Sequence, residues 1–261
     1  MPNDPIIEPS AITAPIRYVD VRDASAFASG HAPNAALVPI GRWEQAAKAP
    51  ETDLSNAAFW GGEIRALGLD GETVAAVYDD GRMTEAARVW FILQHFGIRA
   101  AIVNGGWPAL SEVVPLPAGE APSGAGFVAQ PGAGAVGLVD RERLKAELGD
   151  GVSVLDARTA AEHHGDDLRK NSRGGHLPGA RLLAHADLLD HGSVRSPEDL
   201  RARLEAAGFG PGDHLVTHCD GGGRAALAAA AALRAGYADV RAYYLSFADW
   251  ARDETCTVVR D

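Results

Sequence analysis

The chain has 261 residues, of which 46% are hydrophobic and 23% are charged, proportions that are ordinary for a globular protein. They exclude a collagen-like chain and wholesale disorder, and two cysteines are too few to hold a chain of this length as a disulfide scaffold. The 24 basic and 35 acidic residues give a net charge of −11. Non-specific nucleic-acid binding needs Lys and Arg to neutralise phosphates, so no nucleic-acid partner is expected.

The first ten residues, MPNDPIIEPS, contain neither a basic n-region nor an apolar h-region, so no signal peptide is predicted. The sequence also lacks a run of about 18 apolar residues, and no membrane partner is expected. We therefore predict a cytoplasmic protein with free thiols.

The sequence repeats itself once. Residues 18–35 and 154–180 both contain an apolar residue followed by Asp-x-Arg, and later Gly-His-x-Pro-x-Ala, with extra residues before Gly-His in the second copy. The later parts of the two copies match as well, which places Asp79 against Cys219. A match of this length and order predicts two domains of the same fold.

The stretch between the copies, residues 115–135, is rich in Pro, Gly and Ala and lacks periodicity, which predicts a linker. The predicted domains are therefore residues 1–114 and 136–261. The alternative is one large domain with a surface loop at 115–135.

Each copy alternates short apolar runs typical of strands with longer runs typical of helices. Strands are expected at 16–21, 74–79, 99–104, 152–157, 214–219 and 240–245, and helices at 84–96, 197–207 and 224–235. This alternation predicts an α/β fold with two tandem domains, each a mainly parallel sheet covered by helices on both faces. Ligands of such sheets bind beyond the carboxyl ends of the strands, where Asp156 and Cys219 are expected.

The segment HCDGGGR at residues 218–224 leaves a strand and enters a helix. Three consecutive glycines allow a tight turn with positive φ and point successive N–H groups inward. The start of the helix adds partial positive charge, and Arg224 adds a fixed cation. Such a loop stabilises a thiolate and binds an anion beside the sulfur, so Cys219 is the predicted nucleophile. From the loop alone, phosphate, arsenate and sulfur chemistry all stay open.

Together these motifs resemble the tandem-domain rhodanese family of sulfurtransferases. The resemblance spans nearly the whole chain and rests on Asp156-x-Arg158, on GHLPGA at residues 175–180 and on the six-residue loop from Cys219 to Arg224. In that family such a cysteine takes a sulfane sulfur from a donor, holds it as a persulfide and passes it to a thiophilic acceptor such as cyanide or a thiol. The resemblance implies thiosulfate, 3-mercaptopyruvate or a protein persulfide as the donor, and no cofactor.

The resemblance also assigns roles within the two copies. Only the C-terminal domain normally carries the cysteine, so Asp79 implies a non-catalytic N-terminal domain. The loop residues expected to bind the substrate are Asp220, Gly221, Gly222, Gly223 and Arg224.

Two other functions stay open. Related phosphatases resemble rhodaneses in fold but have five residues between Cys and Arg. Here there are four, and a tighter loop suits a persulfide sulfur better than the larger phosphate. Rhodanese-like domains also serve as sulfur carriers or regulatory binding modules with little turnover of small molecules.

Several charged residues accompany the loop. Asp220 and Glu162 place two acids near the pocket, which is expected to weaken binding of a dianion such as thiosulfate. The inserted stretch carries basic residues that either restore positive charge over the pocket or form a solvated polar loop: His163, His164, Arg169, Lys170 and Arg173. Asp156 and Arg158 are expected to support the site, with the Asp156 carboxylate accepting backbone N–H groups and Arg158 pairing with Asp156 or with another acid.

The remaining cysteine and histidines are expected to be structural. Cys256 is predicted to be a small apolar residue, the alternative being that it resolves the persulfide as a disulfide. His176 is expected to be hydrogen-bonded in its turn, and His218 to point away from the thiol. The sequence has no metal-ligand spacing, Walker loop or dinucleotide fingerprint, so no metal and no cofactor are predicted.

Overall fold

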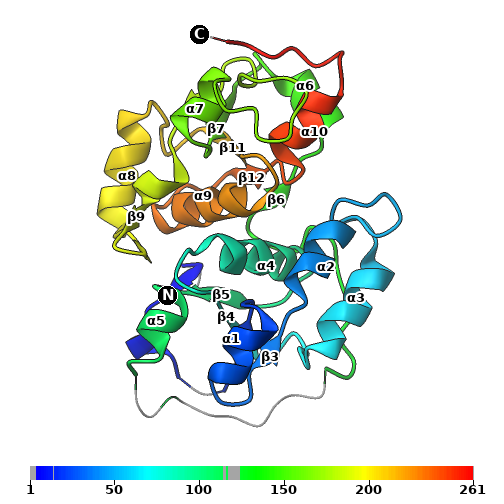
Figure 1. Ribbon diagram of the computed structural model, residues 1–261, viewed down its shortest axis with the longest axis vertical. Coiled ribbons are helices and arrows are strands. Elements are labelled where there is room, and N and C mark those ends of the chain that lie inside the picture. The colour runs from blue at the N-terminus through cyan, green and yellow to red at the C-terminus, as the bar shows by residue number, and fades with distance from the viewer. Residues whose placement is uncertain (1–3, 14, 114–115, 117–123, 261) are drawn as a thin grey trace. The chain divides into compact units, whose positions relative to one another are not determined.

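The computed structural model describes residues 4–13, 15–113, 116 and 124–260. It forms two compact units, Met1–Ala135 together with Gly192–Val194, and Val136–His191 together with Arg195–Asp261 (Figure 1). Each unit is built on a five-stranded sheet in which all neighbouring strands run parallel, with helices around it. The predicted fold class, α/β with two tandem domains on parallel sheets, is confirmed.

The sheet of the first unit has the order β1-β5-β4-β2-β3. Its strands are β1 (Ile6–Ile7), β2 (Ile16–Asp20), β3 (Ala36–Leu37), β4 (Val74–Tyr78) and β5 (Ala100–Val103), and its helices are η1 (Pro9–Ala11), α1 (Ala24–Ser29), α2 (Ile40–Ala46), α3 (Ala57–Ala66), α4 (Thr84–His95) and α5 (Gly106–Leu110). Strand β10 (Ser193–Val194) also groups with this unit. Helix α4 packs on β4 and β5 and is buried from Ala86 to His95, because apolar side chains occur all round it.

The sheet of the second unit has the order β6-β12-β11-β7-β8, which is the same arrangement one copy later. Its strands are β6 (Gly137–Leu138), β7 (Val152–Asp156), β8 (Arg181–Leu182), β11 (His214–His218) and β12 (Val240–Ala242), while β9 (Leu189–Asp190) pairs with β10 in a separate two-stranded sheet. Its helices are α6 (Arg141–Glu147), α7 (Ala160–His164), η2 (His185–Leu188), α8 (Pro197–Ala206), α9 (Gly223–Arg234) and α10 (Ser246–Arg252). Helix α9 packs on β11 and β12.

The helix predicted at 197–207 is confirmed as α8, with Ser196 as its N-cap: the Ser196 hydroxyl accepts the backbone N–H of Asp199. The strand predicted at 240–245 ends earlier, at Ala242. The chain turns there because Ser246 adopts a positive φ of 61° and its hydroxyl donates to the carbonyl of Tyr243 at 2.8 Å.

The predicted linker divides into two parts. Residues 115 and 117–123 lie outside the described residues. Within 124–135 the chain packs on the first unit, since Arg65 donates to the carbonyl of Phe127 at 3.0 Å and the backbone N–H of Gln130 donates to the carbonyl of Phe96. The first compact unit therefore extends to Ala135.

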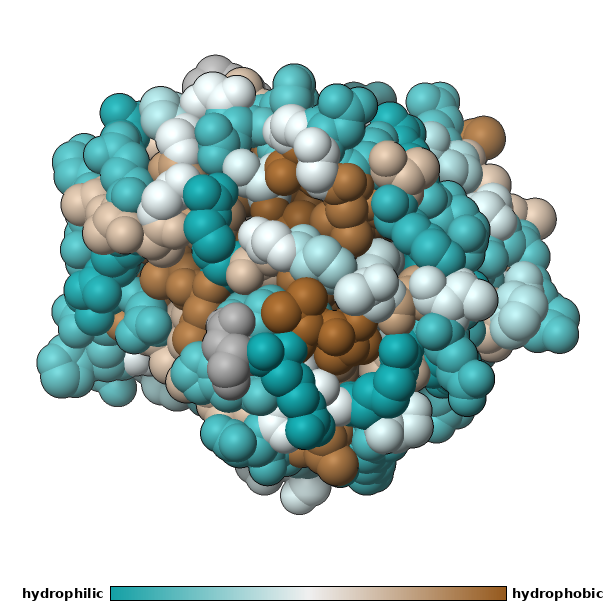
Figure 2. All heavy atoms as spheres, turned by 90° about the horizontal axis from the view of Figure 1, so that it is seen from above, coloured by the Kyte–Doolittle hydropathy of each residue, from teal (hydrophilic) through white to brown (hydrophobic). Residues whose placement is uncertain are grey.

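Among the described residues, no helix combines the length and the apolar character that a membrane crossing requires. Figure 2 shows a mainly hydrophilic face with small hydrophobic patches between polar side chains. Of the large hydrophobic residues described, only Val128 and Leu168 are exposed. The cytoplasmic location stays a prediction.

In the second unit, the carboxyl end of β7 is fixed by the pair Asp156 and Arg158. The arginine donates to the carboxylate from its backbone N–H at 3.0 Å, from Nε at 2.9 Å and from Nη2 at 2.6 Å. Nη2 also donates to the carbonyl of Gly175 at 2.8 Å, and the guanidinium lies 4.0 Å from the ring centre of Phe247. The predicted pairing is confirmed, and we call these four residues the Asp-Arg clamp.

The first unit has the same clamp. Arg22 donates to Asp20 from its backbone N–H at 2.9 Å, from Nε at 3.0 Å and from Nη2 at 2.6 Å, and to the carbonyl of Gly30 at 2.7 Å. Its guanidinium lies 4.5 Å from the ring centre of Trp107. Both carboxylates are fully buried. In each clamp one arginine joins a strand end, a Gly-His turn and an aromatic residue.

Replacing Arg22 with Ala is expected to destabilise the protein by about 3 kcal/mol or more, because the buried carboxylate of Asp20 loses its partner. Urea unfolding followed by circular dichroism measures the change. Arg82→Ala is the matched control, because its ion pair with Asp80 is exposed and is expected to contribute less than about 1 kcal/mol. Equal, small effects of the two substitutions would contradict the role of the clamp.

Candidate active site

Cys219 lies directly after β11, in line with the end of the neighbouring strand β7. The register pairs His218 with Asp156, and the backbone N–H of Ala157 donates to the carbonyl of His218 at 2.9 Å. The first turn of α10 then binds the cysteine, since the N–H of Phe247 donates to the Cys219 carbonyl at 3.0 Å. Two strand ends and one helix therefore fix the backbone on which the thiol sits.

The sulfur of Cys219 lies beside a backbone N–H and a hydroxyl group. The N–H of Gly222 donates to Sγ at 3.1 Å, and the hydroxyl of Ser246 lies 3.7 Å from Sγ while accepting the Cys219 N–H at 3.0 Å. Gly222 has a φ of 101°, and a Cβ there would lie 2.9 Å from the carbonyl oxygen of Tyr244. Only glycine therefore brings this N–H onto the sulfur without strain.

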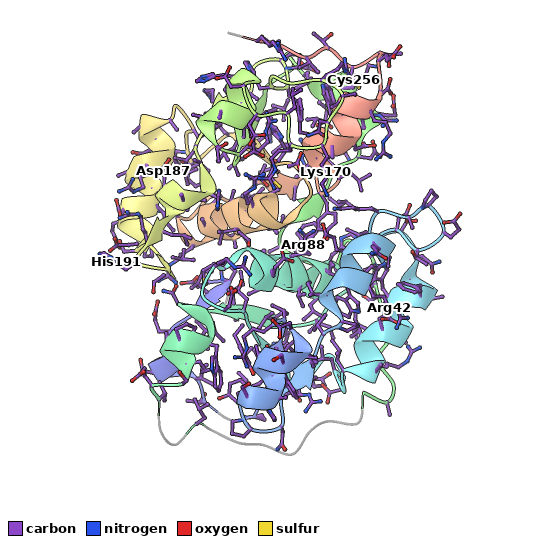
Figure 3. All side chains as sticks on the ribbon, in the orientation of Figure 1. Arg42, Arg88, Lys170, Asp187, His191 and Cys256 are labelled. Carbon is purple, nitrogen blue, oxygen red and sulfur yellow. The ribbon has the colours of Figure 1, made fainter. Side chains whose placement is uncertain are left out.

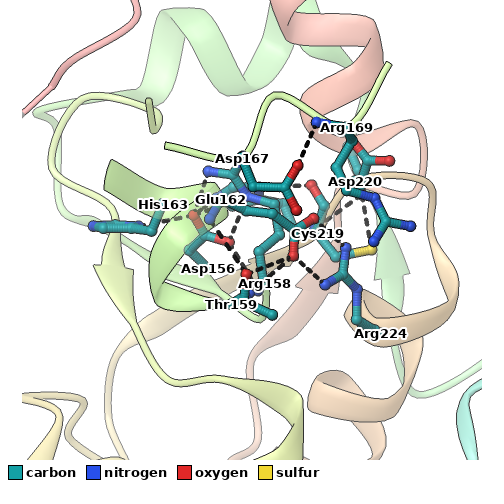
Figure 4. A network of polar contacts seen from close by, with 12 residues as sticks. Asp156, Arg158, Thr159, Glu162, His163, Asp167, Arg169, Cys219, Asp220 and Arg224 are labelled. Atoms are coloured by element: carbon teal, nitrogen blue, oxygen red, sulfur yellow. Dashed lines mark hydrogen bonds and ion pairs between the residues drawn. The ribbon is translucent and has the colours of Figure 1, made fainter. Parts of the chain in front are cut away.

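Arg224, at the end of the cysteine loop (residues 219–224), is paired with Glu162 from α7 (Figure 4). Its two terminal nitrogens donate to the two carboxylate oxygens at 2.6 and 2.7 Å. Thr159 and Glu162 also form a capping box at the start of α7, in which the N–H of Thr159 donates to the same carboxylate. Burial favours the neutral acid, but Arg224 and Thr159 outweigh it and lower the pKa of Glu162 to about 2. The loop arginine therefore faces a charged carboxylate.

Asp220, the residue after the cysteine, is bound from outside the loop. Its Oδ1 accepts a hydrogen bond from the side-chain amide of Asn171 at 2.7 Å. Asn171 belongs to the inserted stretch that the first copy lacks. The loop thus carries one acid at each end of its glycine run, Asp220 in the loop itself and Glu162 on Arg224.

The structure does not bring two of the predicted supporting residues to the sulfur. His163 is buried, and its Nδ1 bonds to Asp156 at 2.9 Å. Arg173 directs its guanidinium to the backbone carbonyls at the end of α10, with bonds to Trp250, Ala251, Asp253 and Cys256. The expectation that Arg173 adds charge over the pocket is therefore wrong, because its donors are used by the helix end.

His218 and His176 are both buried near Asp156 and its partner His163. His218 places Nε2 at 3.7 Å from the Asp156 carboxylate, and His176 stacks on His163 with ring centres 4.0 Å apart. Burial lowers the pKa of His218 to about 4, against the attraction of the Asp156 charge. At neutral pH His218 is therefore an uncharged structural group.

Cys256, labelled in Figure 3, is buried in the hydrophobic core of the second unit with Trp250 and Tyr243. Burial raises the pKa of its thiol, and the nearby charge of Asp253 adds to this shift. A protonated thiol is a poor nucleophile. The expectation of a small apolar core residue is confirmed.

In the first unit, Asp79 occupies the position of the cysteine. Its carboxylate accepts the N–H groups of Gly81 at 2.9 Å, Met83 at 3.1 Å and Ala86 at 3.2 Å, at the start of α4. Burial raises the pKa of Asp79 although these three donors oppose the shift. The Asp79 carboxylate therefore accepts the backbone N–H groups that this loop presents.

Within the residues that the structure describes, no three His, Cys, Asp or Glu side chains are grouped as metal ligands would be. The groups that the structure places at this site are the Cys219 thiol, the N–H of Gly222 and the Arg224–Glu162 pair.

Comparison with known proteins places this geometry in a family. The profile of the rhodanese-like domain matches the chain twice, at residues 9–112 and 140–253. The chain belongs to the rhodanese family of sulfurtransferases. Its two rhodanese units correspond to the two copies found in the sequence.

The curated relatives are sulfurtransferases. A probable 3-mercaptopyruvate sulfurtransferase of Pseudomonas aeruginosa is 34% identical over 200 residues, which cover 73% of this chain and 69% of that protein. A thiosulfate sulfurtransferase of Azotobacter vinelandii is 31% identical over 265 residues, covering 94% and 93%. Among solved structures, an EanB variant in complex with hercynine superposes with a TM-score of 0.76 at 19% identity, over 95% of this chain. This chain spans 64% of that solved chain, and the likeness shows the fold.

Sequence reasoning missed Ser246 and Asn171 as neighbours of the cysteine loop. Ser246 is 27 residues from Cys219 and Asn171 is 49 residues from Asp220, so neither pairing has a local signal. The pairing of Glu162 with Arg224 had a partial one, because Thr-x-x-Glu marks a capping box and so fixes the direction of the carboxylate.

The buried His218 predicts a loss of stability in acid. Its folded pKa of about 4 lies below the ordinary value of 6.5, so the unfolded state binds the proton more tightly. Stability present above pH 6.5 is therefore lost as the pH falls through 4, by about 2 to 3 kcal/mol between pH 7.5 and pH 4.5.

Urea unfolding of wild type and His218→Asn at both pH values measures this loss. The variant is expected to lose about 2 to 3 kcal/mol less than wild type over that interval. His191→Asn, which changes an exposed histidine, serves as the control and is expected to behave as wild type. The same acid loss in wild type and His218→Asn would show that another group dominates.

Proposed function

We propose that the protein transfers a sulfane sulfur from a small donor, thiosulfate or 3-mercaptopyruvate, to cyanide or a thiol through a persulfide on Cys219. The hydrogen bond from the Gly222 N–H to Cys219 Sγ carries this proposal, because it aims a backbone donor at the reacting sulfur. The relatives named as thiosulfate and 3-mercaptopyruvate sulfurtransferases support the two donors.

The chemistry takes two displacements at sulfur. The Cys219 thiolate attacks the outer sulfur of thiosulfate, the bond between the two donor sulfurs breaks, and sulfite leaves with the electron pair. Cyanide then attacks the terminal sulfur of the persulfide, that S–S bond breaks, and thiocyanate leaves while the thiolate is restored. The Gly222 N–H and the N-terminus of α9 stabilise the negative charge that stays on the enzyme sulfur in both steps.

The loop residues Asp220, Gly221, Gly222, Gly223 and Arg224 are proposed to form the donor site. We assign no sulfur transfer to the first rhodanese unit, since a carboxylate cannot form a persulfide. The three N–H groups that bind the Asp79 carboxylate support this assignment.

The charges of the site favour a donor with little negative charge. Glu162 holds both terminal nitrogens of Arg224, and Asp220 adds a second carboxylate beside the thiol. A dianion such as thiosulfate therefore meets more repulsion than 3-mercaptopyruvate, which carries one carboxylate. We propose 3-mercaptopyruvate as the better of the two small donors.

A second candidate function is a sulfur carrier or regulatory rhodanese module with little turnover of small molecules, loaded by a protein persulfide. The carboxylates of Asp220 and Glu162 at the cysteine loop favour this candidate, because they repel small anionic donors. A carrier accepts one sulfur from a protein donor but cycles poorly with small donors, so turnover distinguishes the two.

Incubating the reduced protein with thiosulfate or 3-mercaptopyruvate is expected to add one sulfur atom to its intact mass, and cyanide is expected to remove it. Cys219→Ser abolishes the gain because the nucleophile is lost. Cys256→Ser is the matched control and keeps the gain, since that thiol is buried in the core.

Loading of the Cys219→Ser variant would contradict the mechanism. No gain in wild type with either small donor would favour the carrier. Turnover of p-nitrophenyl phosphate comparable to sulfur transfer would place phosphate chemistry first.

Glu162→Gln is expected to lower the KM for thiosulfate by about fivefold, because it frees the charge of Arg224 while the amide oxygen still accepts the Thr159 N–H. The KM for 3-mercaptopyruvate is expected to change less. Steady-state thiocyanate formation with both donors measures the two constants. A wild-type KM for thiosulfate already in the low micromolar range would contradict this electrostatic reasoning.

A further inference from the structure

The second rhodanese unit contains a loop that the first lacks, residues 166–174, here called the inserted loop. Its two ends are in contact: a Cβ added to Gly165 would lie 2.8 Å from the backbone nitrogen of Gly175. Arg260 joins both ends, donating from Nε to the Gly174 carbonyl at 2.9 Å and from Nη2 to the Gly165 carbonyl at 3.5 Å. A loop with closed ends and its own anchors is an Ω-loop, a form that is frequently functional.

The last residues of the inserted loop are fixed to α10. Arg173 donates to four backbone carbonyls between Trp250 and Cys256, and the hydroxyl of Ser172 donates to the carbonyl of Ala251 at 3.2 Å. The stretch 166–170, in contrast, is exposed, and it includes Lys170 (Figure 3). The loop therefore has a firm base and a free tip.

Between base and tip, one bond ties the inserted loop to the cysteine loop. The side-chain amide of Asn171 donates to Asp220 Oδ1 at 2.7 Å. This hydrogen bond thus holds Asp220, the residue that directly follows Cys219 in the cysteine loop.

The hydrogen bond between Asn171 and Asp220 must break before a donor can reach the thiol. Attack on a donor sulfur requires the donor to reach Cys219 in line with the bond that breaks, at roughly 3 to 3.5 Å. The Cys219 side chain is 1% exposed, so a donor has no path to it while the surroundings keep this arrangement. Because Arg173 and Arg260 hold the base, the part free to move is the stretch that ends at Asn171.

We propose that the inserted loop is a lid over Cys219 and that the hydrogen bond from Asn171 to Asp220 is its latch. The latch breaks when the tip moves outward, and it re-forms when the site is empty or loaded. Asn171 is thus a positioning residue that sets access to the thiol. The inference rests on the proposed role of Cys219 as the reacting group.

Alkylation of Cys219 by iodoacetamide tests the latch, because it reports access to the thiol without any sulfur transfer. Wild type, Asn171→Ala, Asn171→Asp and Ser172→Ala are compared as full chains, and the labelled Cys219 peptide is quantified by mass spectrometry over time. Ser172→Ala is the matched control: it removes a hydrogen bond of the same loop on the side away from the cysteine loop.

Asn171→Ala is expected to raise the rate of Cys219 alkylation by about fivefold, since a hydrogen bond to a charged group is lost. Asn171→Asp is expected to raise it further, because two carboxylates then face each other. Ser172→Ala is expected to stay within about twofold of wild type. Tryptic cleavage after Arg169 and Lys170 is expected to accelerate in the same order, whereas the melting temperatures stay close together.

Equal alkylation rates in wild type and both Asn171 variants would overturn the latch. A large rate increase in Ser172→Ala would also overturn it, because loosening the loop anywhere would then suffice. The outcomes separate from those of the proposed function: altered alkylation together with no sulfur gain would leave the lid standing and remove the sulfurtransferase mechanism.

Discussion

The buried carboxylate of Asp156 is the group on which the second unit depends. An ionised carboxylate without exposure is stable only when its oxygens are bound, and Asp156 obtains these bonds from Arg158 and His163. The same arginine continues to the Gly175 carbonyl and stacks on Phe247. One charge thereby sets the end of β7, the close of the inserted loop and the start of α10. Because α10 also brings Ser246 to Cys219, the position of the thiol follows from this clamp.

The two rhodanese units share the Asp-Arg clamp and differ at the loop that follows the central strand. Asp20 and Arg22 reproduce the bonds of Asp156 and Arg158 to within 0.1 Å at each matching backbone, Nε and Nη2 contact. The geometry of the Asp-Arg clamp therefore varies little between the two units. The loop after the central strand varies more, since a carboxylate or a thiol at its first position can both accept N–H groups at a helix start.

Much of the fold followed from local signals. Ser196-Pro197 and the apolar run at 214–218 were sufficient to place α8 and β11, because caps and strand runs act over a few residues. The repeat made the sheet order of both units equivalent, and Asp156 was one of the acids expected to pair with Arg158. The short β12, the engagement of Arg173 with α10 and the bond from Asn171 to Asp220 did not follow. The last two depend on partners that lie 78 and 49 residues apart in the sequence, whereas β12 ends early because Ser246 adopts a positive φ.

The filled loop of the first unit has a consequence for how the two halves share their tasks. There the donors at the start of α4 are permanently matched by Asp79, so that the loop gains folding free energy and offers nothing to a solute. In the second unit the N–H of Gly222 faces a thiol, which is a softer and weaker acceptor than a carboxylate. The first unit thus uses the hydrogen-bond donors of this loop for its own folding stability. The second unit, whose thiol is the weaker acceptor, gains less stability from the same position of the fold.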